Sequence, residues 1–309
     1  MTVVAGSARD ALGAATDALR AVGVESPRLD AELLLAEATG RERAELVADG
    51  VAEVAPDAGR VFGEMVRRRL RREPVAYILG RRGFRRIELA VDRRVLIPRP
   101  ETELLVDLAV EAEPRSLLDV GTGSGAIALA VADELPACEV TATDTSAAAL
   151  EVARGNAVRL GLADRIEFHH GTLPRECGDL VAHSATKSPQ QVSEKGFDLI
   201  VANLPYVAER DWPGLAPEVT EWEPAEALLA GPEGLDAYRM VIPRISGRTS
   251  TRYPGSNATS TRVGAPVVGL EVGDGQAGAV GEMLREAGFG EIETRRDLAG
   301  IERIVVGRR

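Results

Sequence analysis

The chain has 309 residues, of which 45% are hydrophobic and 28% charged, with a formal net charge of −11. This length and composition indicate one large or two smaller globular domains. No stretch of the sequence approaches the roughly 18 uncharged apolar residues that a membrane span needs. The negative charge argues against binding nucleic acid through its phosphates. The N-terminus lacks the pattern of a secretory signal, and Cys138 and Cys177 are too few for a disulfide framework or a four-cysteine zinc site. We therefore expect a cytoplasmic protein with no metal.

Positive charge is concentrated between residues 60 and 99, where thirteen arginines stand against four acidic residues. A basic segment in an acidic chain indicates contact with an anionic partner. The alternative is a solvated helix face in a chain that uses arginine almost exclusively, because Lys187 and Lys195 are its only lysines.

Residues 1–73 predict a small bundle of helices. Ser7 begins the first helix as part of a capping box, and Ser26 caps the second, which has Pro27 at its first position. A third helix is expected over residues 57–72.

Residues 74–100 predict a linker with an extended or hairpin-like section, since VAYILG, RIELAV and RRVLIP are short apolar runs. The run IPRPETELLVDLAVEA then begins a helix. Its prolines force an extended entry, and Glu101 and Glu103 suit the positive end of the helix dipole.

Residues 101–309 predict an α/β domain with a doubly wound, mostly parallel sheet, because strands and helices alternate. The expected strands are RSLLDVG, CEVTATD, RIEFHHG, FDLIVAN and VVGLEV, and IETRRDL and ERIVVGRR form a closing antiparallel pair. Two stretches rich in Ser, Thr, Gly and Pro, residues 175–196 and 246–264, are expected to be mobile loops.

A glycine-rich loop, Gly121-Thr122-Gly123-Ser124-Gly125, joins the first strand to the next helix. Glycines at this place let the backbone turn tightly and approach a ligand. The loop is neither a phosphate-binding Walker loop nor a full dinucleotide fingerprint. A plain strand-to-helix turn is the alternative.

Asp144 ends the second strand about twenty positions later, where nucleoside-binding α/β folds carry the carboxylate that binds ribose. The alternative is that Asp144 caps the helix that starts at Ser146.

Asn203-Leu204-Pro205-Tyr206 follows the fourth strand and is expected at the same edge of the sheet as the glycine loop. The Asn203 side chain and the Leu204 carbonyl can accept the two protons of a flat NH₂ group, while Tyr206 can stack on it. A turn closed by an Asx hydrogen bond is the alternative.

These residues resemble the release-factor glutamine methyltransferases, the HemK/PrmC family. The resemblance is carried by REPVAYILGRRGF, VDRRVLIPRPETELLVD, LLDVGTGSGAIALA, FDLIVANLPYV and REAGFGEIETRRDLAGIERIVVGRR. It implies a Rossmann-like seven-stranded methyltransferase sheet and a small N-terminal helical bundle that recognises the substrate. It also implies methyl transfer from S-adenosyl-L-methionine, which leaves as S-adenosyl-L-homocysteine. The implied acceptor is the amide nitrogen N5 of the glutamine in the Gly-Gly-Gln motif of peptide-chain release factors.

The resemblance also implies the residues of the site. The implied cofactor-binding residues are Gly121, Thr122, Gly123, Ser124, Gly125, Asp144, Leu173 and Asn203. The glutamine slot consists of Asn203, Leu204, Pro205 and Tyr206, of which Asn203, Pro205 and Tyr206 are the implied catalytic residues.

Three departures from the family pattern stand out. Leu204 replaces a proline of the usual Asn-Pro-Pro-Tyr sequence. Thr172 and Leu173 replace an aspartate and an aromatic residue near the adenine. A Ser/Thr-rich insertion replaces a Pro-Gly-Gly turn in residues 246–264.

The expected mechanism is direct methyl transfer with no covalent intermediate and no strong general base, and His169, His170 and His183 belong to no catalytic motif. Positioning and electrostatics would then carry the reaction. Two other functions stay open: an adenine-N6 methyltransferase acting on nucleic acid, whose exocyclic amine would fit the same slot, and a non-catalytic binding protein that kept the fold. We expect a monomer whose partners are release factors, without direct contact to nucleic acid or membrane.

Overall fold

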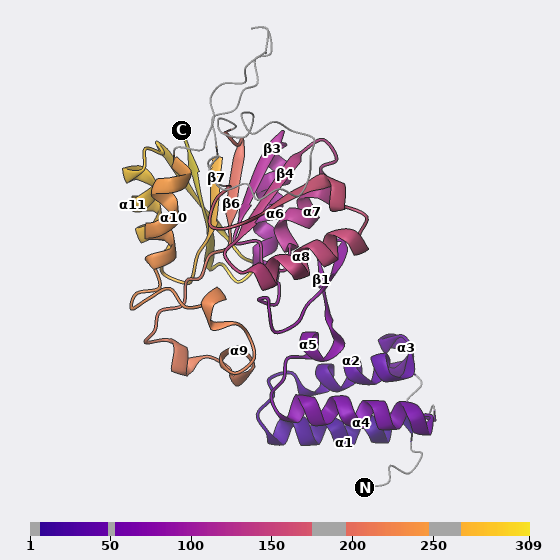
Figure 1. The fold of residues 1–309 in the computed structure, drawn as a ribbon. Helices are drawn as coiled ribbons and strands as arrows, with labels where there is room; N and C mark the ends of the chain where they lie inside the picture. The colour runs from indigo at the N-terminus through magenta and orange to yellow at the C-terminus, as the bar shows by residue number, and fades with distance from the viewer. Residues whose placement is uncertain (1–6, 49–52, 175–195, 247–266) are drawn as a thin grey trace. The chain divides into compact units, whose positions relative to one another are not determined.

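The computed structural model describes residues 7–48, 53–174, 196–246 and 267–309 (Figure 1). The chain forms two compact units, one of residues up to Arg81 with Ala216–Trp222, the other of Arg82–Leu215 with Glu223–Arg309. The loops expected at 175–196 and 246–264 lie almost entirely outside the described residues, as do His183, Cys177 and both lysines.

The first unit is a bundle of helices. Its elements are α1 (Ala8–Ala21), α2 (Pro27–Thr39), α3 (Arg43–Ala48), α4 (Pro56–Leu70), α5 (Val75–Leu79) and, from the distant segment, α9 (Pro217–Thr220). Leu12, Leu19, Leu34 and Leu35 are fully buried in one apolar cluster between the helices. The predicted helical bundle is therefore confirmed, and its hydrophobic faces explain why the helices pack.

The helix ends follow the expected chemistry only in part. The Ser7 side chain accepts a hydrogen bond from the Asp10 backbone N–H at 3.2 Å, as a capping box requires. Ser26 occupies the cap position of α2, but its side chain makes no capping bond. The segment VAYILG is the helix α5 instead of an extended run, and Gly80 ends it in the left-handed region at φ 71°.

The second unit opens with a hairpin, β1 (Arg81–Phe84) and β2 (Ile87–Ala90), which pair as a separate two-stranded sheet. A hairpin was expected in this part of the linker. The run RRVLIP that follows is irregular and leads into a short 3-10 helix, Pro100–Thr102.

A seven-stranded sheet forms the centre of the second unit, with strand order β5-β4-β3-β6-β7-β9-β8. Its strands are β3 (Ser116–Val120), β4 (Glu139–Asp144), β5 (Ile166–His170), β6 (Leu199–Ala202), β7 (Val267–Glu271), β8 (Glu291–Arg296) and β9 (Glu302–Arg308). The first five pair in parallel, while β9 runs antiparallel to β7 and to β8. The expected Rossmann-like methyltransferase sheet is confirmed.

Helices cover both faces of this sheet (Figure 1). The elements are α6 (Glu103–Ala112), α7 (Ala126–Glu134) and α8 (Ala147–Arg159) on one side, and α10 (Asp236–Ser246) and α11 (Ala277–Glu286) on the other. Leu118, Ile200 and Leu270 share an apolar cluster with Tyr238 of α10 and Leu284 of α11. The central strands are buried on both faces for this reason, which explains why β6 is wholly apolar and β3 mostly so.

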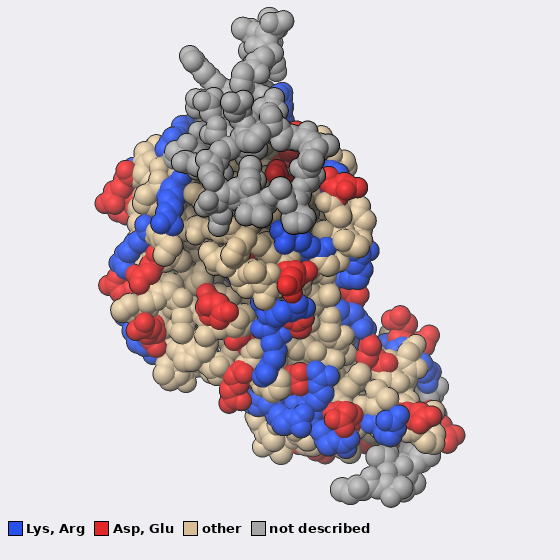
Figure 2. Space-filling view, in the orientation of Figure 1, with Lys and Arg blue, Asp and Glu red and all other residues tan. Residues whose placement is uncertain are grey.

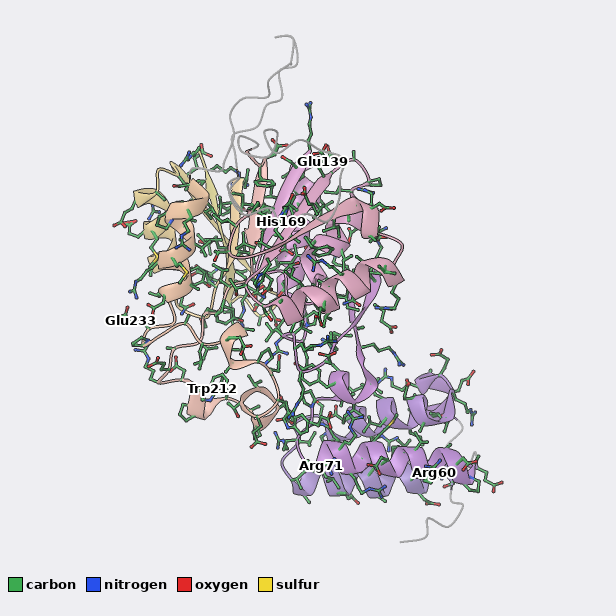
Figure 3. The ribbon with its side chains drawn as sticks, viewed as in Figure 1. Arg60, Arg71, Glu139, His169, Trp212 and Glu233 are labelled. Atoms are coloured by element: carbon green, nitrogen blue, oxygen red, sulfur yellow. The ribbon has the colours of Figure 1, made fainter. Side chains whose placement is uncertain are left out.

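Most of the excess positive charge of residues 60–99 is balanced within the chain. Arg60, Arg71 and Arg82 are exposed and make no ion pair among the described residues; Figure 3 shows the first two toward opposite ends of α4. Positive and negative side chains are intermixed over the face drawn in Figure 2. Nine of the thirteen arginines pair with a carboxylate: Arg67, Arg68, Arg69, Arg72, Arg81, Arg85, Arg86, Arg94 and Arg99.

Candidate active site

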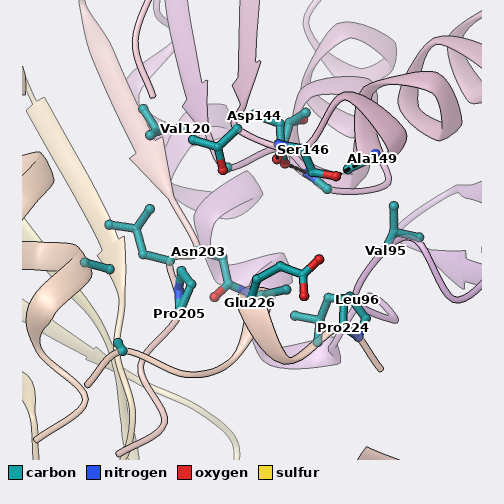
Figure 4. Close-up of a pocket in the computed structure, with 18 of the residues that line it drawn as sticks. Val95, Leu96, Val120, Asp144, Ser146, Ala149, Asn203, Pro205, Pro224 and Glu226 are labelled. Carbon is teal, nitrogen blue, oxygen red and sulfur yellow. Dashed lines mark hydrogen bonds between the residues drawn. The ribbon is translucent and has the colours of Figure 1, made fainter. Parts of the chain in front are cut away.

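A cavity of about 450 Å³ lies at the carboxyl ends of β3, β4 and β6 (Figure 4). Parallel sheets bind ligands at this edge. The predicted residues that line the cavity are Gly121, Thr122, Gly123, Ser124, Asp144, Asn203, Leu204 and Pro205, together with Thr172. Three predicted residues, Gly125, Leu173 and Tyr206, are not part of the lining.

The glycine loop is held by the neighbouring strand. The backbone N–H groups of Gly121 and Thr122 both donate to the Thr143 carbonyl at 2.9 Å. Gly121 and Gly123 have positive φ angles of 77° and 56°, which residues with a Cβ adopt at a cost. A Cβ on Gly123 would meet no atom within 4 Å, so this glycine borders open space in the cavity.

Gly125 is needed for packing and not for the cavity. It has a φ of 86° at the start of α7, and a Cβ there would lie 2.7 Å from the Leu129 Cδ1 atom. Within the loop, Gly125 therefore serves the packing of α7, whereas Gly121, Thr122, Gly123 and Ser124 line the cavity.

Asp119 is buried beneath this loop at the end of β3. Its Oδ2 atom accepts hydrogen bonds from the Thr122 hydroxyl at 2.6 Å and the Ala128 N–H at 3.2 Å, while Oδ1 has no partner among the described residues. Burial raises the pKa of Asp119 to about 7. The carboxyl group thus fixes the turn of the loop from below.

Asp144 accepts two backbone hydrogen bonds at 2.8 Å, from the Gly123 N–H to Oδ2 and from the Ser146 N–H to Oδ1. Ser146, not Asp144, caps α8, because its hydroxyl accepts from the Ala149 N–H. Burial raises the pKa of Asp144, and the two N–H groups oppose that rise. Each carboxylate oxygen keeps a lone pair for a further donor, such as a ribose hydroxyl.

Asn203 and Leu204 follow β6 and present two acceptors without partners. The Nδ2 atom of Asn203 donates to the Thr102 hydroxyl at 3.0 Å, which leaves Oδ1 as the free end of the amide. Within the described residues, neither Asn203 Oδ1 nor the Leu204 carbonyl accepts a hydrogen bond. The Leu204 side chain is buried in the core. Both acceptors belong to residues that line the cavity, so the pair can bind an NH₂ group there.

Tyr206 packs away from the cavity lining. Its ring lies against the core cluster and would be 3.1 Å from a Cβ on Gly273. Burial, followed by the charge of Glu271, raises its pKa to about 12. The Gln276 side chain holds this stretch of backbone, since Nε2 donates to the Tyr206 carbonyl at 3.0 Å and to the Gly234 carbonyl at 3.2 Å.

A buried carboxylate joins two further walls of the cavity. Glu223 accepts from the Ile97 backbone N–H at 3.1 Å and from the Arg99 guanidinium at 2.6 Å. It precedes Pro224 and Glu226, which lie across the cavity from Asp144 in Figure 4. The segment around Pro98 is thereby fixed against the connection between β6 and α10.

The remaining predictions concern residues on β5 and directly after it. Thr172 lines the cavity, and its carbonyl accepts from the Thr143 hydroxyl at 3.0 Å, whereas Leu173 packs on the core cluster. His169, on β5 in Figure 3, lies 3.2 Å from Glu167, and His170 bonds the Thr145 carbonyl. Neither histidine lines the cavity.

Sequence reasoning missed Thr102, Glu223, Glu271 and Gln276. Thr102 lies within the recognised PRPETE segment but was given no role. Glu271 ends an apolar strand at the ligand-binding edge, which is the same signal that pointed to Asp144. Glu223 and Gln276 carry no local signal, because their partners lie far away in the sequence.

Two kinds of feature are absent from the described residues. No helix there is long and apolar enough to cross a membrane. No group of three or more His, Cys, Asp or Glu residues is placed there to hold a metal ion.

Comparison with known proteins matches both units of the chain. The family described as the PrmC N-terminal domain matches residues 10–80, and the methyltransferase small domain matches residues 100–217. Among solved structures, the hMettl16 catalytic domain in complex with MAT2A 3'UTR hairpin 1 is 15% identical, with a TM-score of 0.50 over 71% of this chain and 74% of that chain. At this identity the likeness concerns the fold alone.

Curated relatives match almost the whole chain. The release factor glutamine methyltransferase of Caulobacter vibrioides is 38% identical over 95% of this chain and 93% of its own length. That of Bordetella pertussis is 42% identical over 91% of this chain and 94% of its own length. The chain therefore belongs to the family of release factor glutamine methyltransferases.

Proposed function

We propose that this protein transfers a methyl group from S-adenosylmethionine to the N5 amide nitrogen of the glutamine in the Gly-Gly-Gln motif of peptide-chain release factors. The single observation that carries this proposal is the pair of unused acceptors, Asn203 Oδ1 and the Leu204 carbonyl, on residues that line the same cavity as the glycine loop. The names of the curated relatives support it.

The described residues fit the cofactor. Gly121 and Gly123 form a turn in which the place of the missing Gly123 Cβ is open, so a ligand can approach the backbone closely. Asp144 offers a carboxylate to the ribose hydroxyls at the end of the neighbouring strand. When bound, S-adenosylmethionine supplies a methyl group on a positively charged sulfur.

The chain's own residues would hold the glutamine side chain. A primary amide has two N–H donors, and Asn203 Oδ1 and the Leu204 carbonyl can accept one each. Two fixed acceptors orient the flat amide and stabilise the positive charge that develops on its nitrogen as the new N–C bond forms. One amide proton is then lost to solvent. Pro205 shapes this loop and lines the cavity, while Tyr206 supports it from the core.

The proposed substrate also indicates the partners of the protein and the compartment in which it acts. Release factors are protein partners that act in translation, so the proposed reaction takes place in the cytoplasm. We propose that the protein acts as a monomer. The basic segment needs no nucleic acid to explain it, because most of its arginines pair within the chain.

The test is methylation of a purified bacterial release factor with labelled S-adenosylmethionine, with the methylated residue located by mass spectrometry. We expect one methyl group on the glutamine of the Gly-Gly-Gln motif, and none on a release factor in which that glutamine is replaced by alanine. Asn203→Ala should lower kcat by roughly 10²–10³, the effect of removing one preorganised contact. Cofactor affinity, measured by calorimetry, should change much less.

Other outcomes would reject the proposal. Methylation of adenine in DNA or RNA, with an unmodified release factor, would establish the adenine-N6 activity instead. Cofactor binding without transfer to any of these substrates would point to a binding protein. Transfer by Asn203→Ala at the wild-type rate would remove the slot from the mechanism.

A further inference from the structure

Thr102 lies between the slot residue Asn203 and the buried acid Glu271. Its hydroxyl accepts a hydrogen bond from Asn203 Nδ2 at 3.0 Å, and the same hydroxyl lowers the pKa of the Glu271 carboxyl group. Thr102 is 4% exposed and Glu271 is 1% exposed. The three side chains come from the segment before α6 and from the ends of β6 and β7, so three separate parts of the chain bring these polar groups together.

Neither residue is explained by local structure. Thr102 holds the cap position of α6, yet its side chain makes no capping hydrogen bond. Among the described residues, Glu271 pairs with no cation, and its Oε2 atom has no hydrogen-bond partner. Burying a carboxyl group with so few partners is costly, so a role in stability alone does not account for it.

The direction of the hydrogen bonds determines which end of Asn203 reaches the cavity. A hydroxyl group has one proton, and the negative charge of the Glu271 carboxylate attracts the Thr102 proton. Thr102 can then only accept from Asn203, which directs Nδ2 toward Thr102 and leaves Oδ1 as the free acceptor. If the amide were turned over, its NH₂ group would face a substrate NH₂ group, and two donors do not bind each other.

We propose that Thr102 and Glu271 are positioning residues, which lock the Asn203 side chain in the orientation that accepts the substrate amide. The inference rests on the proposed function of the slot. It adds that the orientation of the Asn203 amide is fixed by Thr102, 101 positions earlier in the chain, and by Glu271, the last residue of β7.

The ionisation of Glu271 gives the arrangement a pH dependence. Burial raises the pKa of Glu271 to about 7, assisted by the negative charge of Glu101 and opposed by the Thr102 hydroxyl, Arg303 and Arg99. Once protonated, Glu271 can donate to Thr102. The Thr102 hydroxyl can then donate its proton to Asn203. This favours the reversed orientation of the amide, in which Oδ1 faces Thr102 and the NH₂ group faces the cavity.

The first test compares Thr102→Val with Thr102→Ser in single-turnover methylation of a release factor at saturating S-adenosylmethionine. Valine keeps the shape and removes the hydroxyl group. We expect at least a tenfold fall in the transfer rate, as is usual for the loss of a partner that orients a functional group. Serine keeps the hydroxyl and should stay within about threefold of the wild type. The cofactor Kd should be unchanged in both variants.

A matched control separates positioning from a loss of stability. Ser116 is also buried and its hydroxyl accepts from the Asp198 N–H at 3.2 Å, but it starts β3, at the opposite end of the strand from the cavity, and does not line the cavity. Ser116→Ala should lower thermal stability about as much as Thr102→Val while leaving the transfer rate unchanged. Wild-type transfer by Thr102→Val, or equal losses in Thr102→Val and Thr102→Ser, would overturn the inference. A wild-type enzyme that methylates no release factor would instead reject the proposed function.

The second test uses Glu271→Gln, which removes the ionisation and keeps the shape. The wild-type transfer rate should rise with pH around the Glu271 pKa of about 7, and the variant should show no such rise between about pH 6 and 8. Asp119 also has a pKa of about 7, but it lies under the glycine loop, so its titration should act on cofactor affinity, which saturation removes. An unchanged rise in Glu271→Gln would exclude Glu271 from this role.

Discussion

The backbone N–H of Gly123 donates a hydrogen bond of 2.8 Å to the Oδ2 atom of Asp144. The bond joins the end of β4 to the glycine loop that follows β3, so the two proposed cofactor contacts share one geometry. A substitution at either residue should therefore alter the position of the other.

The first prediction concerns Gly123→Val. Its φ of 56° is strained for a β-branched residue, and the new side chain would enter the open cavity, so S-adenosylmethionine binding should be lost while the protein stays folded. Gly161→Val is the matched control, since Gly161 also has a positive φ of 70° and open space but does not line the cavity. Calorimetry should find wild-type affinity for the control. Wild-type affinity for Gly123→Val would remove the loop from the cofactor site.

The second prediction concerns Asp144→Ala. The change leaves the N–H groups of Gly123 and Ser146 without their acceptor and removes the ribose contact, so cofactor binding should weaken by roughly 1–3 kcal/mol. Ser7→Ala is the control for lost helix stability, because Ser7 caps α1 in the first unit. It should cost about 1 kcal/mol in unfolding free energy and leave the cofactor Kd unchanged. A cofactor Kd that is unchanged in Asp144→Ala, as it is expected to be in Ser7→Ala, would contradict the assignment of Asp144 to the ribose.

The third prediction concerns Glu218 in the segment that belongs to the helical unit. Its carboxylate pairs with Arg69 at 2.6 Å, and Arg69 also pairs with Asp30 at 2.7 Å. The Arg69 and Glu218 side chains are 6% and 17% exposed, so Glu218→Ala leaves a buried cation short of a partner. We expect the unfolding free energy to fall by about 3 kcal/mol, at the lower end for a broken buried pair.

The control for Glu218 is Glu64→Ala, which breaks the Arg67–Glu64 pair whose side chains are 61% and 59% exposed. Its effect on the unfolding free energy should be much smaller than that of Glu218→Ala, because solvent screens exposed pairs. Chemical denaturation of both variants measures the difference. Equal effects would show that the segment 216–222 contributes no buried ion pair to the helical unit.

The fourth prediction concerns stability against pH. Burial raises the pKa of Glu271 from 4.5 to about 7 and that of Asp119 from 3.8 to about 7. The folded protein therefore binds protons that the unfolded chain has already released, so the stability from these groups is complete below about pH 4 and is lost as the pH rises through 7. Glu271→Gln should reduce the fall in unfolding free energy between pH 5 and 8 by, at most, roughly 3 kcal/mol. A fall as steep as in the wild type would contradict the buried ionisation.

Local patterns were sufficient for the strands of the sheet, for most of the helices and for part of the cavity lining. The mostly apolar sequences of β3 and β6 predicted buried parallel strands, because strands covered on both faces carry few polar residues. The glycine loop and Asp144 were found because backbone turns and strand ends have short-range signatures. The helix α5 was missed, since a five-residue apolar run between Pro74 and Gly80 fits a strand equally well.

Only the tertiary structure decided which polar groups meet. Asn203 and Thr102 are 101 positions apart, and Arg69 and Glu218 are 149 positions apart. No periodicity links such residues, because their contact depends on how whole segments pack and on the requirement that buried polar groups find partners. For the same reason the sequence could count thirteen arginines between residues 60 and 99 but could not show that nine of them are balanced by carboxylates within the fold.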